Sequence, residues 1–146
     1  MNIPFNQYLA IAAVFNIIVS VLHVAIILFG ASWYRFFGAG EKMVRLSESG
    51  SWYPNIVTFC IATILFVWGC YALSGAGLIS LLPITKLMLG IITLIYLVRG
   101  ITPIPILIFL KQRVTPFWCW SSAICLLFGI IHLVGFIRLS RVLNNI

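Results

Sequence analysis

Four long apolar stretches make up most of this sequence and limit the folds that it can adopt. Each is close to the roughly 20 residues that an α-helix needs to cross the hydrocarbon core of a bilayer. Only 8% of the residues are charged, against roughly 25% in soluble domains, so the chain has too few polar side chains to cover a soluble globule. We therefore predict an all-α integral membrane four-helix bundle, a single domain over residues 1–146, with spans at about 8–30, 55–73, 83–98 and 117–139.

The end of the third stretch is ambiguous. Hydropathy alone would extend it to Leu110, but Pro103 and Pro105 interrupt the sequence. Proline removes a backbone donor and disrupts a regular helix. The sequence therefore leaves two readings of Ile101–Leu110: a broken continuation of the third span, or an interfacial or re-entrant segment.

The basic side chains indicate how the spans are oriented. Six of the nine Lys and Arg residues follow the first or the third stretch, and three lie at the opposite ends. Cytoplasmic loops carry the excess of positive charge in membrane proteins, so we expect both termini outside the cytoplasm. The N-terminus lacks the basic residues of a secretory signal, and the first span is expected to remain in the protein. We interpret the net charge of +7 as basic residues that orient the chain in the membrane and contact anionic headgroups, and we exclude a nucleic-acid partner.

The longest polar interval, residues 33–54, contains both acidic residues of the sequence. Read as a helix, residues 41–48 place their charged side chains on one face, as in a short helix that lies in the headgroup layer. Trp-Tyr pairs at both ends of the interval are typical membrane-interface anchors. Two interpretations follow: the charged face is solvated, or it forms one wall of a pocket for an amphipathic or anionic ligand. The residues that would form this wall are Arg35, Glu41, Arg45 and Glu48.

Arg99 closes the third apolar stretch, shortly after Tyr96, on the same side of the membrane as the polar interval. A guanidinium at membrane depth is costly unless it is paired or hydrated. Glu41 and Glu48 are the only side-chain carboxylates, so we expect Arg99 to pair with one of them or to hold a lipid or substrate anion. The alternative is that Arg99 extends to the headgroup phosphates. Tyr96 and Arg99 complete the set of predicted ligand-binding residues.

Polar side chains inside the apolar stretches form two inward-facing stripes, which helices in lipid use for close packing. The stripes contain Asn16, Ser20 and His23 in the first span, and Ser121 and His132 in the fourth. We expect structural hydrogen bonds for the histidines, His23 with a Ser or Asn neighbour; a proton path is the alternative. Their depths differ by roughly 12 Å, which excludes a haem held by both imidazoles. The four cysteines lack metal-binding spacing and are expected to be buried, so we predict no metal and no cofactor.

Three stretches carry a family resemblance: WYRFFGAGE from Trp33, YALSGAG from Tyr71, and LPITKLMLGIITLIYLVRG, which ends at Gly100. They are similar to stretches of an uncharacterised family of small four-span bacterial inner-membrane proteins. The resemblance implies a bacterial inner membrane, where the termini that the basic residues place outside the cytoplasm would be periplasmic, and it carries over no catalytic residue.

No catalytic signature is present, neither a phosphate-binding glycine loop nor a nucleophile elbow. We therefore predict a non-enzymatic inner-membrane protein that binds a lipid-like or hydrophobic ligand or serves as a membrane subunit of a complex. Its expected partners are the bilayer and a second copy or a larger membrane complex. One alternative is a small transporter or transporter subunit, with the histidine stripes along its path. The other is a membrane enzyme acting on lipid headgroups, with Glu41 or Glu48 as general base.

Overall fold

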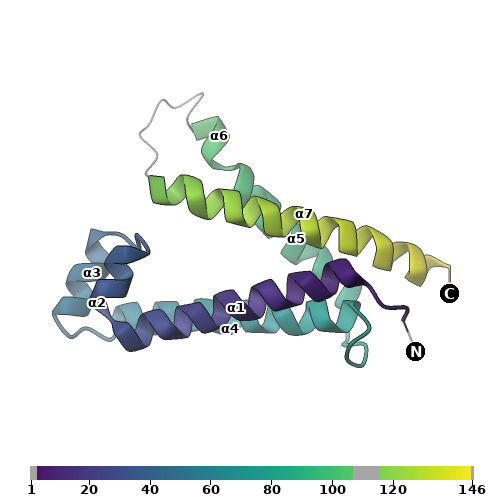
Figure 1. Cartoon of the computed structure of the whole chain (residues 1–146), viewed down its shortest axis with the longest axis horizontal. Helices are drawn as coiled ribbons and strands as arrows, with labels where there is room; N and C mark the ends of the chain where they lie inside the picture. Colours follow the sequence, from purple (N-terminus) through teal and green to yellow (C-terminus); the bar gives the residue numbers. More distant parts are fainter. Residues whose placement is uncertain (1–2, 107–115, 146) are drawn as a thin grey trace. The chain divides into compact units, whose positions relative to one another are not determined.

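The computed structural model describes residues 3–106 and 116–145, and all regular secondary structure in these ranges is helical (Figure 1). The helices are α1 Gln7–Phe29, α2 Ala31–Phe36, α3 Glu41–Glu48, α4 Tyr53–Gly75, α5 Thr85–Ile101, α6 Pro103–Pro105 and α7 Pro116–Asn144. Four segments are long and apolar enough to cross a membrane: Gln7–Phe29, Tyr53–Gly75, Thr85–Pro105 and Phe117–Asn144. The predicted all-α fold with four spans is confirmed, and the chain is a multi-pass membrane protein.

Two helices show how far hydropathy defines helix ends. α3 has the predicted bounds, and the flanking Gly40 and Gly50 have φ angles of 94° and 75°, which glycine adopts without strain. α7 instead continues past the predicted end at Leu139 to Asn144. Its last turn is tied to α5 by a 2.7 Å hydrogen bond from Lys86 Nζ to Asn144 Oδ1. Hydropathy marks the part of a helix that crosses the bilayer, whereas the helix itself can extend further.

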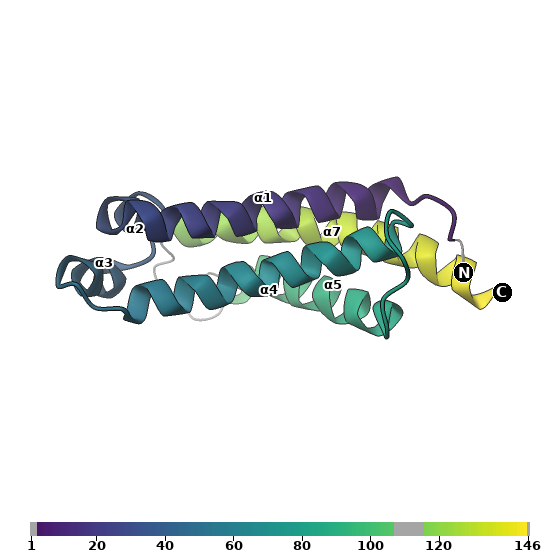
Figure 2. The same cartoon turned by 90° about the horizontal axis from the view of Figure 1, so that it is seen from below.

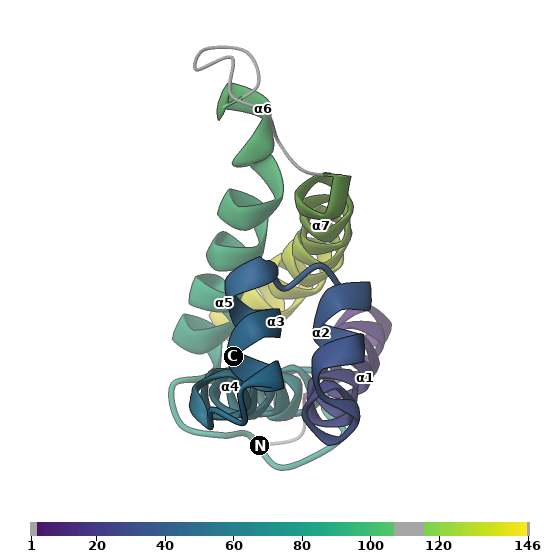
Figure 3. The same ribbon diagram turned by 90° about the vertical axis from the view of Figure 1, so that its left-hand side faces the viewer.

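The third span continues beyond the predicted end at residue 98. α5 is regular to Ile101, Thr102 forms a turn, and the single turn of α6 follows (Figure 3). The Thr102 hydroxyl donates to the Val98 carbonyl oxygen at 2.6 Å. Pro103 is tolerated because it begins the new turn, where a backbone N–H would have no helical partner. Residues 101–106 are therefore a broken continuation of the third span, and residues 107–110 lie outside the described ranges.

The helices form two compact packing units: residues 16–67, and the described residues of Met1–Phe15 and Trp68–Ile146. Both α1 and α4 contribute residues to each unit. In the unit of residues 16–67, α1 and α4 run side by side (Figure 2), and α2 packs against α3. Tyr34 of α2 is buried with Ile26 and Val44. A single domain over the whole chain remains a prediction.

The other unit is built around the antiparallel hairpin of α5 and α7, and the first turns of α1 pack against the second half of α7. Two glycines allow the close approach that helices in lipid favour. A Cβ at Gly100 of α5 would lie 2.7 Å from Leu126 Cα of α7. A Cβ at Gly135 of α7 would lie 2.6 Å from Leu9 Cγ of α1. The N-terminal segment is thereby brought beside the last turns of α7.

Candidate functional site

The four charged residues of the predicted loop wall pair with one another. Arg35 Nη2 lies 2.7 Å from Glu48 Oε1, and Arg45 Nε lies 3.3 Å from Glu41 Oε1. All four side chains are about half exposed or more, so each pair contributes only ~0.2–1 kcal/mol. Val44, on the opposite face of α3, is buried. The structure favours the first interpretation, in which these charges are the solvated face of an interfacial helix.

The same contacts bear on the enzyme alternative. A general base needs a carboxylate within reach of a bound substrate. Glu41 and Glu48 are instead held by arginines, and neither lines either of the two pockets described below. The geometry therefore offers no support for either glutamate as a general base.

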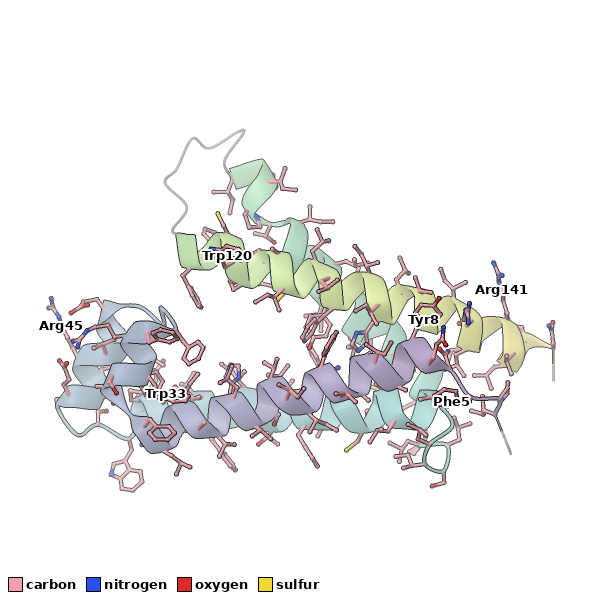
Figure 4. All side chains as sticks on the ribbon, viewed as in Figure 1. Phe5, Tyr8, Trp33, Arg45, Trp120 and Arg141 are labelled. Atoms are coloured by element: carbon pink, nitrogen blue, oxygen red, sulfur yellow. The ribbon has the colours of Figure 1, made fainter. Side chains whose placement is uncertain are left out.

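Aromatic rings, some exposed and some partly buried, lie beside this polar loop. Phe29, Trp33 and Phe37 follow one another with ring centroids 4.3 Å and 5.6 Å apart, and Figure 4 shows Trp33 on this part of the chain. Phe36 and Trp52 are 83% and 77% exposed. Such rings are typical of the boundary between membrane and water. The sequence predicted Tyr34 as an anchor of this kind, and that is wrong: α2 turns it into the core, while Phe36, which the prediction missed, faces outward.

Arg99 lies at the end of α5, against the first turns of α7. Its Nη1 donates to Ser122 Oγ at 2.7 Å and its Nη2 to Ser121 Oγ at 3.3 Å. Its guanidinium carbon is 5.9 Å from the ring centroid of Trp118. Both glutamates have arginine partners in their own unit, so the expected ion pair with Arg99 is not what satisfies these groups. Charge alone pointed to the glutamates and not to Ser121 and Ser122, because hydroxyl groups carry no charge that a sequence pattern would reveal.

Tyr96 faces the interior of the α5–α7 hairpin and is only 5% exposed. The centroid of its ring lies 5.1 Å from that of Trp68, 5.6 Å from Phe128 and 5.2 Å from His132. The Trp68 indole and the Phe128 ring each lie edge-on to the Tyr96 ring, an arrangement that aromatic pairs prefer. The structure therefore packs Tyr96 in the core of the hairpin, and its place in a ligand site stays a prediction.

The predicted polar residues within the spans bond mainly to the backbone. Ser20 Oγ on α1 donates to the carbonyl oxygen of Ala62 on α4 at 2.7 Å. Ser121 Oγ donates to the Trp118 carbonyl oxygen at 3.1 Å and accepts from Arg99. Asn16 is fully buried. Ser20 thus ties α1 to α4, whereas Ser121 bonds within α7 and also belongs to the Arg99 site.

Both histidines bond to the carbonyl oxygen one turn earlier on their own helix. Nδ1 of His23 lies 2.8 Å from the Val19 oxygen, and Nδ1 of His132 lies 2.9 Å from the Phe128 oxygen. A carbonyl only accepts, so each imidazole donates from Nδ1. The expectation of structural hydrogen bonds is confirmed, but a Ser or Asn partner for His23 is wrong. The carbonyl one turn back lies on the same helix face and is within reach without any help from a neighbouring helix.

The cysteines differ from expectation at two positions. Cys60 and Cys119 are exposed, and Cys70 and Cys125 are partly buried. An apolar side chain on a membrane span faces either lipid or protein, so apolar character alone does not predict burial. Within residues 3–106 and 116–145, no three His, Cys, Asp or Glu side chains come together as metal ligands.

A pocket of about 250 Å³ lies at the opposite end of the hairpin from Arg99, between the N-terminal segment and the last turns of α7. Figure 4 labels Phe5 and Tyr8 on one side and Arg141 on α7. The lining residues are Ile3, Pro4, Phe5, Asn6, Arg138, Leu139, Arg141 and Val142. Sequence reasoning missed this pocket, although two arginines three residues apart at the end of the last span were a signal.

A second, open groove of about 590 Å³ lies along α5. Its lining is apolar apart from one lysine and consists of Ile84, Lys86, Leu87, Gly90, Ile91, Leu94 and Phe136. Lipid covers apolar surface of this kind in a membrane-spanning helix pair.

The fold and these sites define a small multi-pass α-helical membrane protein with basic groups at both ends of one helical hairpin. Comparison of the chain with protein-family models, with curated proteins and with solved structures finds no match. The resemblance to a bacterial four-span family stays a prediction.

Proposed function

We propose that this is an inner-membrane protein that binds an anionic, lipid-like ligand through Arg99. The chemistry around the guanidinium supports this most: within the described residues its partners are two hydroxyls and one indole ring, all uncharged. The sequence has only two side-chain carboxylates, and both are paired with other arginines. A partly buried positive charge at the edge of a bilayer requires an anionic partner. Anionic headgroups are the partner that the membrane supplies.

The two serine hydroxyls also orient Arg99 for such a ligand. A guanidinium has five N–H donors in a fixed fork, and the bonds to Ser121 and Ser122 use two of them. The donors that remain suit a phosphate or carboxylate group, which accepts two parallel hydrogen bonds from arginine. Lysine carries the same charge but lacks the fork. The site should therefore distinguish arginine from lysine, whereas nonspecific contact with headgroups should not.

Replacement of Arg99 tests the proposal. We expect the wild-type chain to retain a phosphatidylglycerol molecule at this site through exchange into a non-ionic detergent. Arg99→Gln and Arg99→Lys should each weaken this binding about tenfold or more, because a hydrogen bond to a charged group contributes ~1.5–3 kcal/mol. Native mass spectrometry counts the retained lipids. Lys42→Gln, which removes an exposed charge from α3, is the control and should bind as the wild type does.

Equal lipid retention by the wild type and both Arg99 variants would contradict the proposal, since the fork would then make no difference. Phosphatidylcholine retained as well as phosphatidylglycerol would also contradict it, because the net charge would not be recognised. The same spectra report the mass of the assembly. A second copy or a larger membrane complex, which we propose as partners for part of the exposed apolar surface, would appear there as added mass.

We also propose that Arg99 lies on the cytoplasmic side of a bacterial inner membrane and that both termini are periplasmic. Six of the nine basic residues follow the first and third spans, and such an excess marks the cytoplasmic side. A reporter that is active only in the periplasm should therefore be active when fused after Ile146. The same reporter inserted after Ser49, between α3 and α4, should be inactive. The reverse pattern would invert the orientation.

A further inference from the structure

Asn6 holds together the pocket between the N-terminal segment and α7. Its Nδ2 donates to the Gly135 carbonyl oxygen of α7 at 2.8 Å, and its backbone N–H donates to the Ala76 carbonyl oxygen at 3.1 Å. A Cβ at Gly77 would lie 2.8 Å from the Ile3 carbonyl oxygen, so the segment also packs directly on the connection after α4. The pocket is therefore part of the folded unit and does not need a ligand to form.

Two arginine residues line this pocket, and neither is paired with an acidic side chain of the part of the chain that the structure describes. Arg138 and Arg141 are three residues apart on α7, where neighbouring like charges repel. The guanidinium carbon of Arg138 lies 4.5 Å from the ring centroid of Tyr8, a contact that holds it against α1. The ion pairs within the described residues belong to α2 and α3. Among residues 3–106 and 116–145, both arginines of the pocket are thus left without an ion-pair partner.

The position of the pocket along α7 places it near the second headgroup layer. Ser122, which bonds to Arg99, and Arg138 are 16 positions apart (122 to 138), a rise of ~24 Å at 1.5 Å per residue. The hydrocarbon core of a bilayer is ~30 Å thick. The two basic sites therefore lie near opposite surfaces of the membrane, and a ligand reaches the pocket from the leaflet opposite to Arg99.

We propose that this pocket binds a phosphate-bearing anion, either the headgroup of an anionic lipid or a free phosphate ester. Its volume of about 250 Å³ is below the ~300–1,000 Å³ of pockets for drug-sized ligands, so it suits a headgroup and not a whole amphiphile. Two arginine forks can bind one phosphate through parallel hydrogen bonds, and the anion offsets their repulsion. The site is separate from Arg99 and does not depend on the function proposed there.

Two probes applied to the full chain in non-ionic detergent test this proposal. One is phosphatidylglycerol in mixed micelles, with phosphatidylcholine as the comparison without net charge; the other is glycerol phosphate in solution. We expect Arg138→Gln/Arg141→Gln to bind the preferred probe at least about tenfold more weakly than the wild type, because charge-assisted hydrogen bonds are lost. Calorimetry measures the affinity. Preference for the lipid identifies a headgroup site, and preference for glycerol phosphate identifies a water-soluble ligand.

Matched variants separate this pocket from the Arg99 site and from general charge effects. Arg138→Lys/Arg141→Lys keeps the charge but loses the forks, and should also bind more weakly than the wild type. Lys86→Gln removes a positive charge from the same end of the hairpin and should bind as the wild type does. Combined with Arg99→Gln, which removes the other proposed lipid site, Arg138→Gln/Arg141→Gln should weaken binding of the preferred probe by the same factor. The proposal is overturned if the double glutamine variant binds both probes like the wild type, if the wild type binds neither, or if phosphatidylcholine binds as tightly as the preferred probe.

Discussion

Replacement of Tyr34 by alanine is expected to lower the free energy of unfolding by ~3–5 kcal/mol, the cost of removing a large aromatic side chain from a packed core. Tyr34 is 1% exposed and packs with Ile26 of α1 and Val44 of α3. Its hydroxyl donates to Thr58 Oγ1 of α4 at 3.0 Å. One side chain thus joins four helices of this unit, and its loss should release α2 and α3 from the spans. Denaturant titration of the solubilised protein, followed by tryptophan fluorescence, measures the change.

Two further tyrosine variants show whether packing causes this effect. Tyr34→Phe keeps the ring and removes only the hydroxyl, so we expect a cost of about 1 kcal/mol. Tyr53→Ala alters a side chain that is 55% exposed and should stay within ~0.5 kcal/mol of the wild type. If Tyr34→Ala unfolds at the same denaturant concentration as Tyr53→Ala, Tyr34 does not form the core of this unit.

Alanine at position 100 is expected to force α5 and α7 apart. A Cβ on Gly100 would lie 2.7 Å from both the backbone N and the Cα of Leu126. Backbone atoms cannot rotate away as a side chain can, so we expect a cost at the upper end of the ~1–3 kcal/mol typical of overpacking. Arg99 is the preceding residue, and the separation should lengthen its 2.7 Å hydrogen bond to Ser122. The unfolding midpoint and the number of retained phosphatidylglycerol molecules measure these two effects.

Gly90→Ala is the matched control on the same helix. A Cβ at Gly90 would lie 3.5 Å from the Phe136 ring, an ordinary contact. Alanine also favours the helix over glycine by up to ~1 kcal/mol. We therefore expect this variant to be as stable as the wild type or more stable. Equal stability of the alanine variants at positions 90 and 100 would show that the close approach of α5 to α7 at Gly100 does not occur.

The spans and the interfacial helix were predictable because each depends on neighbouring residues. Apolar length marks the membrane segments, and the charged and apolar faces of residues 41–48 predicted α3 with its observed bounds. The proline at position 103 predicted a break in the third span, which the structure places at Thr102. In each case the bilayer or the local backbone allows few alternatives.

The partners of the functional side chains were less predictable. Charge pointed from Arg99 to the two glutamates, but these are held by arginines within the α2–α3 region, and Arg99 is held by Ser121 and Ser122 of the next span. Tyr34 looked like an interface anchor because it follows a tryptophan, but the position of α2 turns it inward. These contacts depend on the rotation of each helix about its own axis and on its distance from neighbouring helices, and the type of a residue reveals neither.

From the sequence alone it follows that the chain is helical, crosses the membrane several times and is basic at both membrane surfaces, because a bilayer excludes nearly every other arrangement of such residues. Which basic groups share a pocket follows from packing. Asn6 and Arg138 lie near opposite ends of the sequence and meet because Gly135 lets α1 approach α7. The two arginines were visible in the sequence, but the distance between them and the N-terminal segment depends on tertiary contacts, so the pocket itself was decided by the tertiary structure.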